Sequence, residues 1–306
     1  MTCRSLSSAC PPTTSLTTGA LSMEHHPLHP DADPAFCFDY VALDGPDYDL
    51  ADGSRMMTYW DVEPLCRGPE PVPAWLVTDR AAIDTDLGVL KSGKEAEAVL
   101  VERAVPGGPG CTLVAKRYRS AEHRLFQRSV VYTEGRGVRR SRDARAMKKA
   151  TAHGREVAAA GWAATEWEWL QRCHAAGIPV PYPTQIDGTE ILMELVTHDG
   201  SPAPRLVDAR PDRATAAAWF DQLRDAMAGL ARLGVAHGDL SPYNVLVAGD
   251  RLVIIDLPQV VDLAANPAGT DFLQRDVHNV CQWFARRGVA ADEEALFADL
   301  VVQAFG

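Results

Sequence analysis

The sequence lacks any hydrophobic run long enough to cross a bilayer, and it lacks paired cysteines. A transmembrane helix needs about 20 consecutive apolar residues, and no stretch of this 306-residue chain approaches that length. The seven cysteines are odd in number, scattered and never arranged as Cys-x-x-Cys, which argues against a disulfide framework and against a structural zinc site. We therefore predict a cytoplasmic protein with free thiols.

The first 75 residues lack the patterns of a folded domain. Residues 1–22 hold ten Ser or Thr, one Arg and no acidic residue, and they have no continuous apolar core of the kind a secretory signal requires. We predict a disordered leader, with Met23 as an alternative start, and the single Arg speaks against an organellar transit peptide. Asp, Pro and Gly are frequent from 27 to 73, which is typical of irregular chain with at most one short helix.

The chain has no overall excess of basic residues, because its formal net charge is −11. This charge argues against a general nucleic-acid binder. Residues 117–155 differ from the rest, since they contain 12 Lys or Arg against three acidic residues, a local charge of +9. Such a segment attracts phosphates or an acidic partner, or it is a solvated insertion.

Short apolar and β-branched segments at 89–90, 98–101 and 112–116 are separated by stretches rich in turn-forming residues. They predict three antiparallel strands. Apolar residues at three- and four-residue steps predict a helix over 156–176, which Gly and Pro end. A further strand is expected over 189–196.

Three apolar stripes at helical spacing occupy the last third of the chain. Their members are Trp219, Phe220, Leu223, Met227, Leu230 and Leu233; Phe272, Leu273, Val277, Val280 and Phe284; and Leu296, Phe297, Leu300, Val301 and Phe305. We predict an α+β fold of two lobes. A β-rich N-lobe spans 76–196 and carries the basic insertion, a hinge lies near 194–197, and a reduced helical C-lobe spans 197–306.

Candidate catalytic residues are concentrated between residues 237 and 259. Asp239 and Asn244 flank a loop that contains Pro, and Asp256 follows an apolar run that reads as two short strands joined by a turn. Phosphoryl transfer requires a cation for the nucleotide phosphates, oxygen ligands for magnesium and a group that orients the acceptor. Asn244 and Asp256 are suitable ligands for Mg²⁺, and the Asp239 carboxylate can hydrogen-bond an acceptor hydroxyl.

This order of residues, His-x-Asp-Leu-x-x-x-Asn, a hydrophobic strand, a turn and Ile-Ile-Asp, resembles the protein-kinase-like superfamily. The narrower resemblance is to the first subfamily of the RIO atypical kinases. Residues 237–244 resemble the RIO catalytic loop, and residues 255–259 resemble its metal loop, in which Asp-x-x-Gln replaces Asp-Phe-Gly. Residues 271–280 are similar to a C-terminal helix of the family. We assign His237 no catalytic role, and Gln259 a role in the loop's conformation.

The resemblance implies nucleotide-binding residues in the N-lobe. The Ser-Gly-Lys-Glu-Ala motif that contains Ser92 and Lys94 is similar to the family's phosphate loop, although Gly-x-Gly-x-x-Gly is absent. Lys116 matches the strand lysine that holds the α- and β-phosphates of ATP. Glu166, rather than Glu168, matches the helix residue that pairs with this lysine.

The segment from Glu194 to Val196 resembles the hinge that binds adenine through its backbone. The resemblance covers roughly residues 83–288. Gly238 and Pro242 depart from the commonest RIO residues, and the first 80 residues match no pattern.

The function that the resemblance implies is transfer of the γ-phosphoryl group of ATP, with Mg²⁺, to Ser or Thr of a protein, including the chain itself. Asp239 orients the acceptor, and Lys116 and Lys94 hold the phosphates. The C-lobe has no Ala-Pro-Glu, and little chain lies between Asp256 and the terminal helices, so neither an activation loop nor a peptide-docking region is evident.

Two alternatives stay open. One is a small-molecule phosphotransferase resembling aminoglycoside or choline kinases, which Gly238 favours and the Asp-x-x-Gln ending at Gln259 disfavours. The other is an ATPase switch in ribosome-related assembly, in which Asp256 accepts the phosphoryl group and the basic segment 117–155 contacts RNA or the ribosome.

Overall fold

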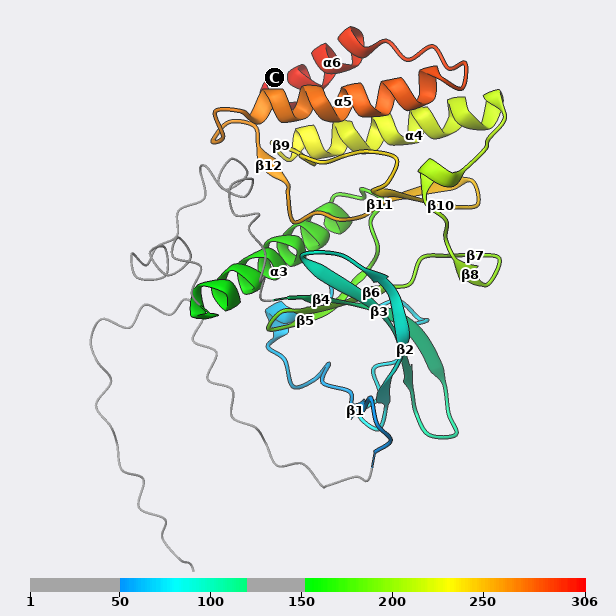
Figure 1. Ribbon diagram of the computed structural model, residues 1–306, viewed down its shortest axis with the longest axis vertical. Coiled ribbons are helices and arrows are strands. Elements are labelled where there is room, and N and C mark those ends of the chain that lie inside the picture. The colour runs from blue at the N-terminus through cyan, green and yellow to red at the C-terminus, as the bar shows by residue number, and fades with distance from the viewer. Residues whose placement is uncertain (1–49, 120–151) are drawn as a thin grey trace, which may run out of the picture. The chain divides into compact units, whose positions relative to one another are not determined.

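The computed structural model describes residues 50–119 and 152–306 (Figure 1). The N-lobe is built on a six-stranded antiparallel sheet in the order β1-β2-β3-β4-β6-β5. Its strands are β1 (Ser54–Met56), β2 (Ile83–Ser92), β3 (Ala96–Ala104), β4 (Gly110–Tyr118), β5 (Pro183–Asp187) and β6 (Glu190–Glu194). The three strands expected between 89 and 116 are β2, β3 and β4, so that prediction is confirmed.

One face of the sheet is buried because side chains alternate along β3 and β4. Val101 and Leu113 are fully buried, and they pack with Met57, Tyr59 and Leu76 from the chain that precedes β2. This packing holds the start of the described chain against the sheet. The stretch that we expected to be irregular therefore contributes an edge strand, β1, and a short helical turn, η1 (Pro64–Cys66).

The helix α3 (Ala152–Ala175) packs on β4, β5 and β6. Leu170 and Cys173 lie on its buried face, as the apolar spacing predicts. Gly177 ends this segment with a φ of +71°, a conformation that glycine adopts without strain. The indole N–H of Trp167 donates to the carbonyl of Leu65 at 3.2 Å, so this tryptophan packs against the N-lobe.

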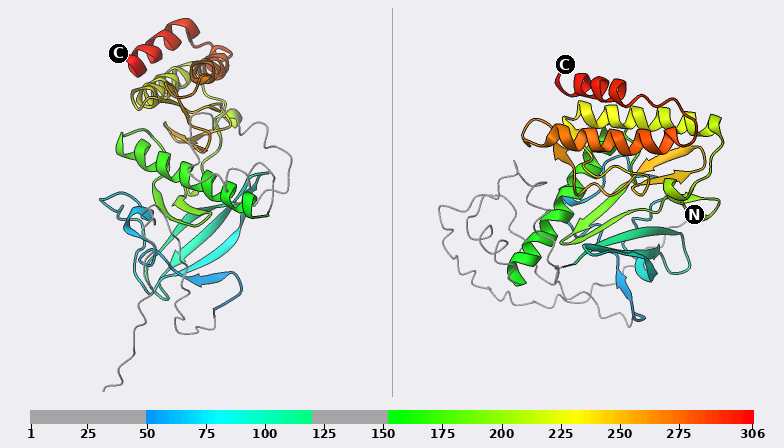
Figure 2. Two further views of the ribbon diagram at one scale, coloured as in Figure 1. Left: turned by 90° about the vertical axis from the view of Figure 1, so that its left-hand side faces the viewer. Right: turned by 45° about the horizontal axis from the view of Figure 1, so that its top comes forward.

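The C-lobe is helical around two small hairpins. Its helices are α4 (Arg213–Arg232), α5 (Gly269–Ala285) and α6 (Glu293–Phe305), and its short elements are β7 (Thr197–His198), β8 (Ser201–Pro202), η2 (Leu206–Asp208), β9 (Val235–Ala236), β10 (Val245–Ala248), β11 (Arg251–Ile254) and β12 (Val261–Asp262). Figure 2 shows α4, α5 and α6 side by side beyond the β10–β11 hairpin. The three apolar stripes form these helices, as predicted.

Several expectations fall outside the described residues. They are the disordered leader at 1–22, the alternative start at Met23 and most of the basic segment 117–155. The described cysteines, Cys66, Cys111, Cys173 and Cys281, are free thiols. In the described parts of the chain, no helix is both long enough and apolar enough to span a membrane.

Candidate active site

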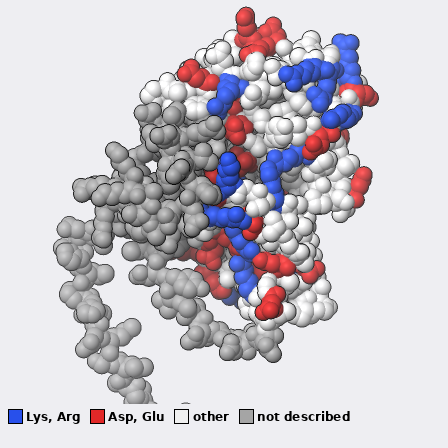
Figure 3. Space-filling view, viewed as in Figure 1, with Lys and Arg blue, Asp and Glu red and all other residues white. Residues whose placement is uncertain are grey.

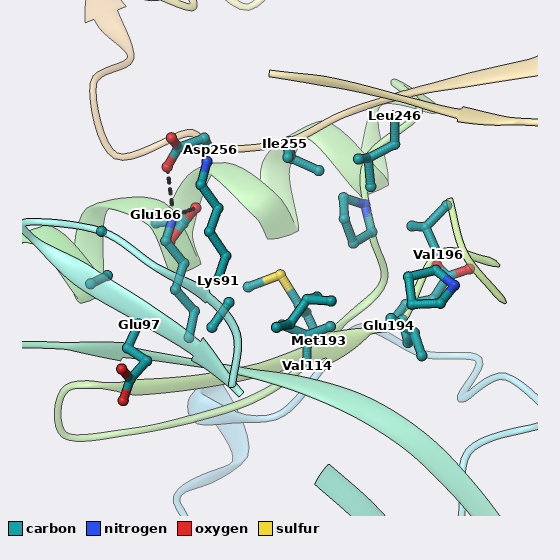
Figure 4. Close-up of a pocket in the computed structure, with 18 of the residues that line it drawn as sticks. Lys91, Glu97, Val114, Glu166, Met193, Glu194, Val196, Leu246, Ile255 and Asp256 are labelled. Atoms are coloured by element: carbon teal, nitrogen blue, oxygen red, sulfur yellow. Dashed lines mark hydrogen bonds and ion pairs between the residues drawn. The ribbon is translucent and has the colours of Figure 1, made fainter. Parts of the chain in front are cut away.

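A cavity of about 570 Å³ lies where the sheet faces the β10–β11 hairpin (Figure 4). Apolar residues form one end of it, among them Val114, Met193 and Leu246. Charged residues gather at the other end, where the strand lysine meets the metal loop. An apolar slot that leads to a charged end fits a flat base attached to phosphates.

Three segments that are distant in the sequence converge at the charged end. The Lys116 ammonium lies 2.6 Å from Glu166 Oε1 and 2.6 Å from Asp256 Oδ1. Glu166 is almost fully buried, whereas the Asp256 side chain is 47% exposed. Glu168 instead pairs with Arg172 at 3.3 Å on the exposed side of α3. The structure thus places Glu166, the residue we preferred, beside the strand lysine.

The Glu166 carboxylate is fixed by further donors. Tyr118 donates its hydroxyl to Oε2 at 2.5 Å, and the backbone N–H of Leu257 donates to Oε1 at 3.3 Å. Burial alone would lower the pKa of Lys116, but Glu166 and Asp256 raise it. The lysine is therefore a permanent cation in a fixed position, as a phosphate-binding group must be.

Asp256 has a left-handed backbone, with a φ of +71°. A residue other than glycine adopts this conformation at a cost of about 1–3 kcal/mol, and such residues concentrate at functional sites. Burial acts to raise the pKa of Asp256, but the neighbouring Lys116 outweighs it and lowers that pKa. The metal loop thus presents an ionised carboxylate to the cavity (Figure 4).

Asp239 and Asn244 lie against each other in the catalytic loop. The Asn244 amide nitrogen donates to the Asp239 carbonyl at 2.9 Å and to its carboxylate at 3.3 Å. The amide oxygen of Asn244 is thus the end left for a cation. Burial raises the pKa of Asp239, so this carboxylate is a better proton acceptor than an exposed one.

Magnesium fits the donor chemistry of this site. The Asn244 amide oxygen and the Asp256 carboxylate are hard oxygen ligands, and Mg²⁺ takes one or two carboxylates together with phosphate oxygens. No group of three or more His, Cys, Asp or Glu residues within 50–119 and 152–306 is arranged to hold a metal ion. Two protein ligands are enough for a magnesium ion whose other ligands include the phosphate oxygens of a nucleotide.

The catalytic loop is anchored by a residue that sequence reasoning missed. Buried Asp276, on α5, accepts the backbone N–H groups of Gly238 and Leu240, both at 2.8 Å. Arg275 donates to the Gly238 carbonyl, and Asn279 donates to the Leu240 carbonyl at 3.0 Å. The similarity of residues 271–280 to a family helix marked this segment, but no local pattern connected it with the loop.

His237 braces the catalytic loop. The Asp239 N–H donates to its Nδ1 at 3.3 Å, so the ring proton lies on Nε2, which donates to the Ile255 carbonyl at 3.1 Å. Burial lowers the pKa of His237, which keeps the ring neutral. The ring thereby joins the catalytic loop to the strand that leads into the metal loop.

Gly238 has a steric reason for being glycine. Its φ is +83°, and a Cβ atom at this position would stand 2.3 Å from the carbonyl oxygen of Gln259. The catalytic and metal loops therefore touch through their backbones. This contact explains why residue 238 is a glycine, whatever the substrate is.

The phosphate loop is the turn between β2 and β3. Lys94 lines the cavity, as expected, but Lys91 lines it too, and Figure 4 shows its side chain extended toward Asp256. Burial lowers the pKa of Lys91, and the positive charges of Arg205 and Lys116 lower it further. Sequence reasoning missed Lys91, although a second lysine three residues before Lys94 was a visible signal.

Ser92 differs from the other predicted residues of this loop. It is not among the residues that line the cavity. Its hydroxyl instead accepts a hydrogen bond from Arg119 at 3.1 Å. Because β2 alternates its side chains, Ser92 turns to the other side of the strand from Lys91, and the structure does not bring it to the site.

The predicted hinge borders the apolar end of the cavity. Glu194 and Val196 both line it. The Glu194 carboxylate accepts a hydrogen bond from the Tyr182 N–H at 3.0 Å, so its side chain is already engaged within the N-lobe. An adenine base would therefore contact the backbone of this segment, as expected. Arg205 also lines the cavity and donates to the Tyr243 carbonyl at 2.6 Å.

The described beginning of the basic segment is neutralised. Arg117 pairs with Asp86 at 2.6 Å and with Glu190 at 2.5 Å. Arg119 pairs with Glu97. These two arginines are thus engaged within the N-lobe rather than available to RNA, and residues 120–151 lie outside the described chain.

Comparisons with known proteins agree with this geometry. The family model of the RIO domain matches residues 113–296. The RIO-type serine/threonine-protein kinase Rio1 of Haloferax volcanii is 34% identical over 215 residues, which cover 70% of this chain and 68% of that protein. The serine/threonine-protein kinase RIO1 of Caenorhabditis elegans is 37% identical over 129 residues, but the match covers 42% of this chain and only 25% of that protein.

A solved structure shows the same fold. The Rio2 kinase of Chaetomium thermophilum, in a complex with ADP, Mg²⁺ and phosphoaspartate, superposes with a TM-score of 0.52 at 22% identity. The superposition covers 72% of this chain and 63% of that one. The predicted two-lobed kinase-like fold is thereby confirmed.

Proposed function

The chain belongs to the RIO family, whose named relatives are serine/threonine-protein kinases, and from this premise we propose that it transfers the γ-phosphoryl group of ATP to Ser or Thr of a protein, including itself. The observation that carries the proposal is the convergence of Lys116, Glu166 and Asp256, joined to the Asp239–Asn244 pair by the hydrogen bond from the Ile255 N–H to the Asn244 carbonyl at 3.0 Å. Cation, metal ligands and acceptor-orienting carboxylate are the three requirements of the reaction.

Each residue has a role that its surroundings support. The apolar slot at Met193 and Val196 receives adenine, and Lys116, with a lysine of the phosphate loop, holds the phosphates. A magnesium ion on Asn244 and Asp256 would neutralise part of the phosphate charge. Asp239 accepts a hydrogen bond from the acceptor hydroxyl, orients it toward the γ-phosphorus and takes its proton.

The small-molecule alternative loses its main sequence argument. Gly238 suggested it, but the contact of Gly238 with the Gln259 carbonyl gives this glycine a structural reason. The named relatives are protein kinases, which favours a protein acceptor.

A phosphorylated Asp256 is a second candidate step. The carboxylate is ionised and faces the cavity, and the Rio2 complex of similar fold contains a phosphoaspartate. In this step an Asp256 oxygen attacks the γ-phosphorus, ADP leaves, and water later hydrolyses the acyl phosphate. An ATPase switch in ribosome-related assembly, in the cytoplasm, would use this chemistry, and segment 117–155 is its candidate RNA contact.

The test uses ATP labelled in its γ-phosphate. We expect the purified chain to label itself or an added protein, and Asp239→Asn to reduce transfer by about 10²–10⁴-fold, the usual contribution of a general base. Asp299→Asn, at an exposed position of α6, is the matched control. Full transfer by Asp239→Asn would sink the assignment.

The chemistry of the label separates the two candidate steps. A Ser or Thr phosphate survives hydroxylamine, whereas an acyl phosphate on Asp256 is cleaved by it. Label that is stable to hydroxylamine supports the kinase reaction, and label that is lost supports the aspartyl intermediate.

A further inference from the structure

Four arginines gather on the C-lobe, outside the cavity. Arg210 precedes α4, Arg213 begins it, and Arg286 and Arg287 follow the last turn of α5. Figure 3 shows basic side chains gathered at the upper right of this face, where Figure 1 places the first turn of α4. We call Arg210, Arg213, Arg286 and Arg287 the arginine surface.

The surface is held in place by the backbone rather than by acids. Arg210 donates to the Ala209 carbonyl at 2.9 Å, and Arg287 reaches the same carbonyl at 3.5 Å. Arg287 also lies 3.4 Å from the centre of the Trp283 ring. Two guanidinium groups thereby approach the same carbonyl oxygen atom.

No carboxylate within the described chain forms an ion pair with any of the four arginines. Asp212, the acidic neighbour of Arg213, uses its carboxylate to cap α4 at the Thr215 N–H, at 2.7 Å. Burial and the neighbouring Arg210 and Arg286 lower the pKa of Arg287, which is the sign of uncompensated positive charge. In a chain of net charge −11, such a group is selective for an anion.

The surface is connected with the catalytic loop by two short paths. Arg205 donates to the Tyr243 carbonyl, and the Val207 N–H donates to the Pro242 carbonyl at 3.0 Å. Arg210 is five residues beyond Arg205, so their Cα atoms are at most about 17 Å apart. Along α5, Arg286 lies seven residues, about 10 Å, beyond the loop anchor Asn279.

We propose that the arginine surface docks acidic side chains of the protein substrate, several residues away from the Ser or Thr that is phosphorylated. The proposal rests on the kinase function proposed above and names its substrate class. The surface is compact, and the aromatic ring that Arg287 covers, Trp283, is buried. Nucleic-acid sites use an extended basic groove with free aromatic rings, so an acidic peptide fits better.

The test compares two peptides with the same acceptor serine, one flanked by Glu and Asp and the other by Gln and Asn. The test variant is Arg210→Gln/Arg286→Gln, which removes two exposed charges and leaves the Arg287–Trp283 contact intact. The control variant is Arg232→Gln/Arg251→Gln, which removes two charges from other exposed parts of the C-lobe.

We expect the wild type to prefer the acidic peptide. In the test variant, kcat/KM for that peptide should fall roughly tenfold, as expected for two solvent-exposed charge pairs, mainly through KM. The kcat/KM for the neutral peptide and the KM for ATP should not change, and the control variant should behave as the wild type. Equal losses on both peptides, or equal losses in both variants, overturn the proposal.

Direct binding separates this proposal from the kinase function. The acidic peptide carries a fluorophore, and its anisotropy is measured without ATP. If no peptide is phosphorylated but the test variant alone binds the acidic peptide more weakly, the surface is supported and the kinase proposal fails. If the test variant loses binding to single-stranded RNA while its peptide binding is unchanged, the peptide assignment is overturned and the partner is identified as nucleic acid.

Discussion

The catalytic loop and the phosphate loop both bring charged side chains near Asp256 but are held in opposite ways. The catalytic loop is anchored through its backbone, by Asp276 and Asn279 on α5 and by the His237 ring. The phosphate loop is a surface turn of β2–β3, closed by the hydrogen bond from the Gly93 N–H to the Ala96 carbonyl at 2.9 Å. It presents its charge on long lysine side chains.

The difference corresponds to what each loop must do. An acceptor-orienting carboxylate works only within a narrow geometry, so Asp239 stands on a backbone that several buried contacts fix. Phosphate binding by an ammonium group needs charge more than direction, so lysines on a turn suffice. The strand lysine Lys116 is an intermediate case, since Glu166 and Asp256 fix a flexible side chain.

The largest expected effect tests the anchor of the catalytic loop. Asp276→Asn replaces one acceptor oxygen with an amide group that faces a buried backbone N–H. A buried donor left without a partner costs about 1–3 kcal/mol, and we expect a loss of about 2–4 kcal/mol in the free energy of unfolding, measured with urea at neutral pH. Phosphoryl transfer should fall as well, because Gly238 and Leu240 lose their anchor.

Asp271→Asn, at an exposed position in the first turn of α5, is the control for Asp276→Asn. It removes one carboxylate from the same helix and should cost less than about 1 kcal/mol. If the two variants unfold at the same urea concentration, the loop is not held by Asp276 and the contrast between the two loops disappears.

A smaller effect decides which lysine of the phosphate loop matters. Lys91→Met should raise the KM for ATP about tenfold to a hundredfold, since a charge-assisted hydrogen bond contributes about 1.5–3 kcal/mol. Lys94→Met should raise it less, because the Lys91 side chain is the one that extends toward Asp256. Arg80→Met, at an exposed position of the N-lobe, should leave it unchanged. A larger effect of Lys94→Met would restore the assignment made from the sequence.

The sequence predicted those parts of the site that are encoded by local patterns. Asp239, Asn244 and Asp256 stand in one continuous stretch, and the strand–turn–strand before Asp256 follows from an apolar run that a Gly-Asp turn interrupts. Lys116 and Glu166 were placed together through the family resemblance, and their 2.6 Å contact supports that pairing.

The missed features depend on contacts between distant parts of the chain. Asp276 reaches the catalytic loop from α5, and β1 is held because the chain between it and β2 packs on the sheet. The arginine surface unites two segments more than 70 residues apart, Arg210 and Arg287. No periodicity reports such contacts, since each partner is unremarkable in its own neighbourhood.

The smallest expected effect is the pH dependence of stability, in which the two anchors of the catalytic loop act in opposite directions. Burial lowers the pKa of His237 from 6.5, so the unfolded chain binds more protons as the pH falls below about 6.5, and the stability due to His237 is lost there. Burial raises the pKa of Asp276 from 3.8 to about 7. The folded chain therefore binds more protons between these values, and the stability due to Asp276 is lost as the pH rises through 7.

Urea unfolding at pH 5 and pH 7.5 separates the two contributions. His237→Gln keeps a donor for the Ile255 carbonyl and removes the titration, so the stability that this variant loses relative to the wild type should be greater at pH 7.5 than at pH 5. For Asp276→Asn the loss should be greater at pH 5, because the wild type then holds the extra proton. Each bound proton changes the free energy of unfolding by about 1.4 kcal/mol per pH unit. The same sign of change in both variants would mean that one of the two groups is not titrating as its burial requires.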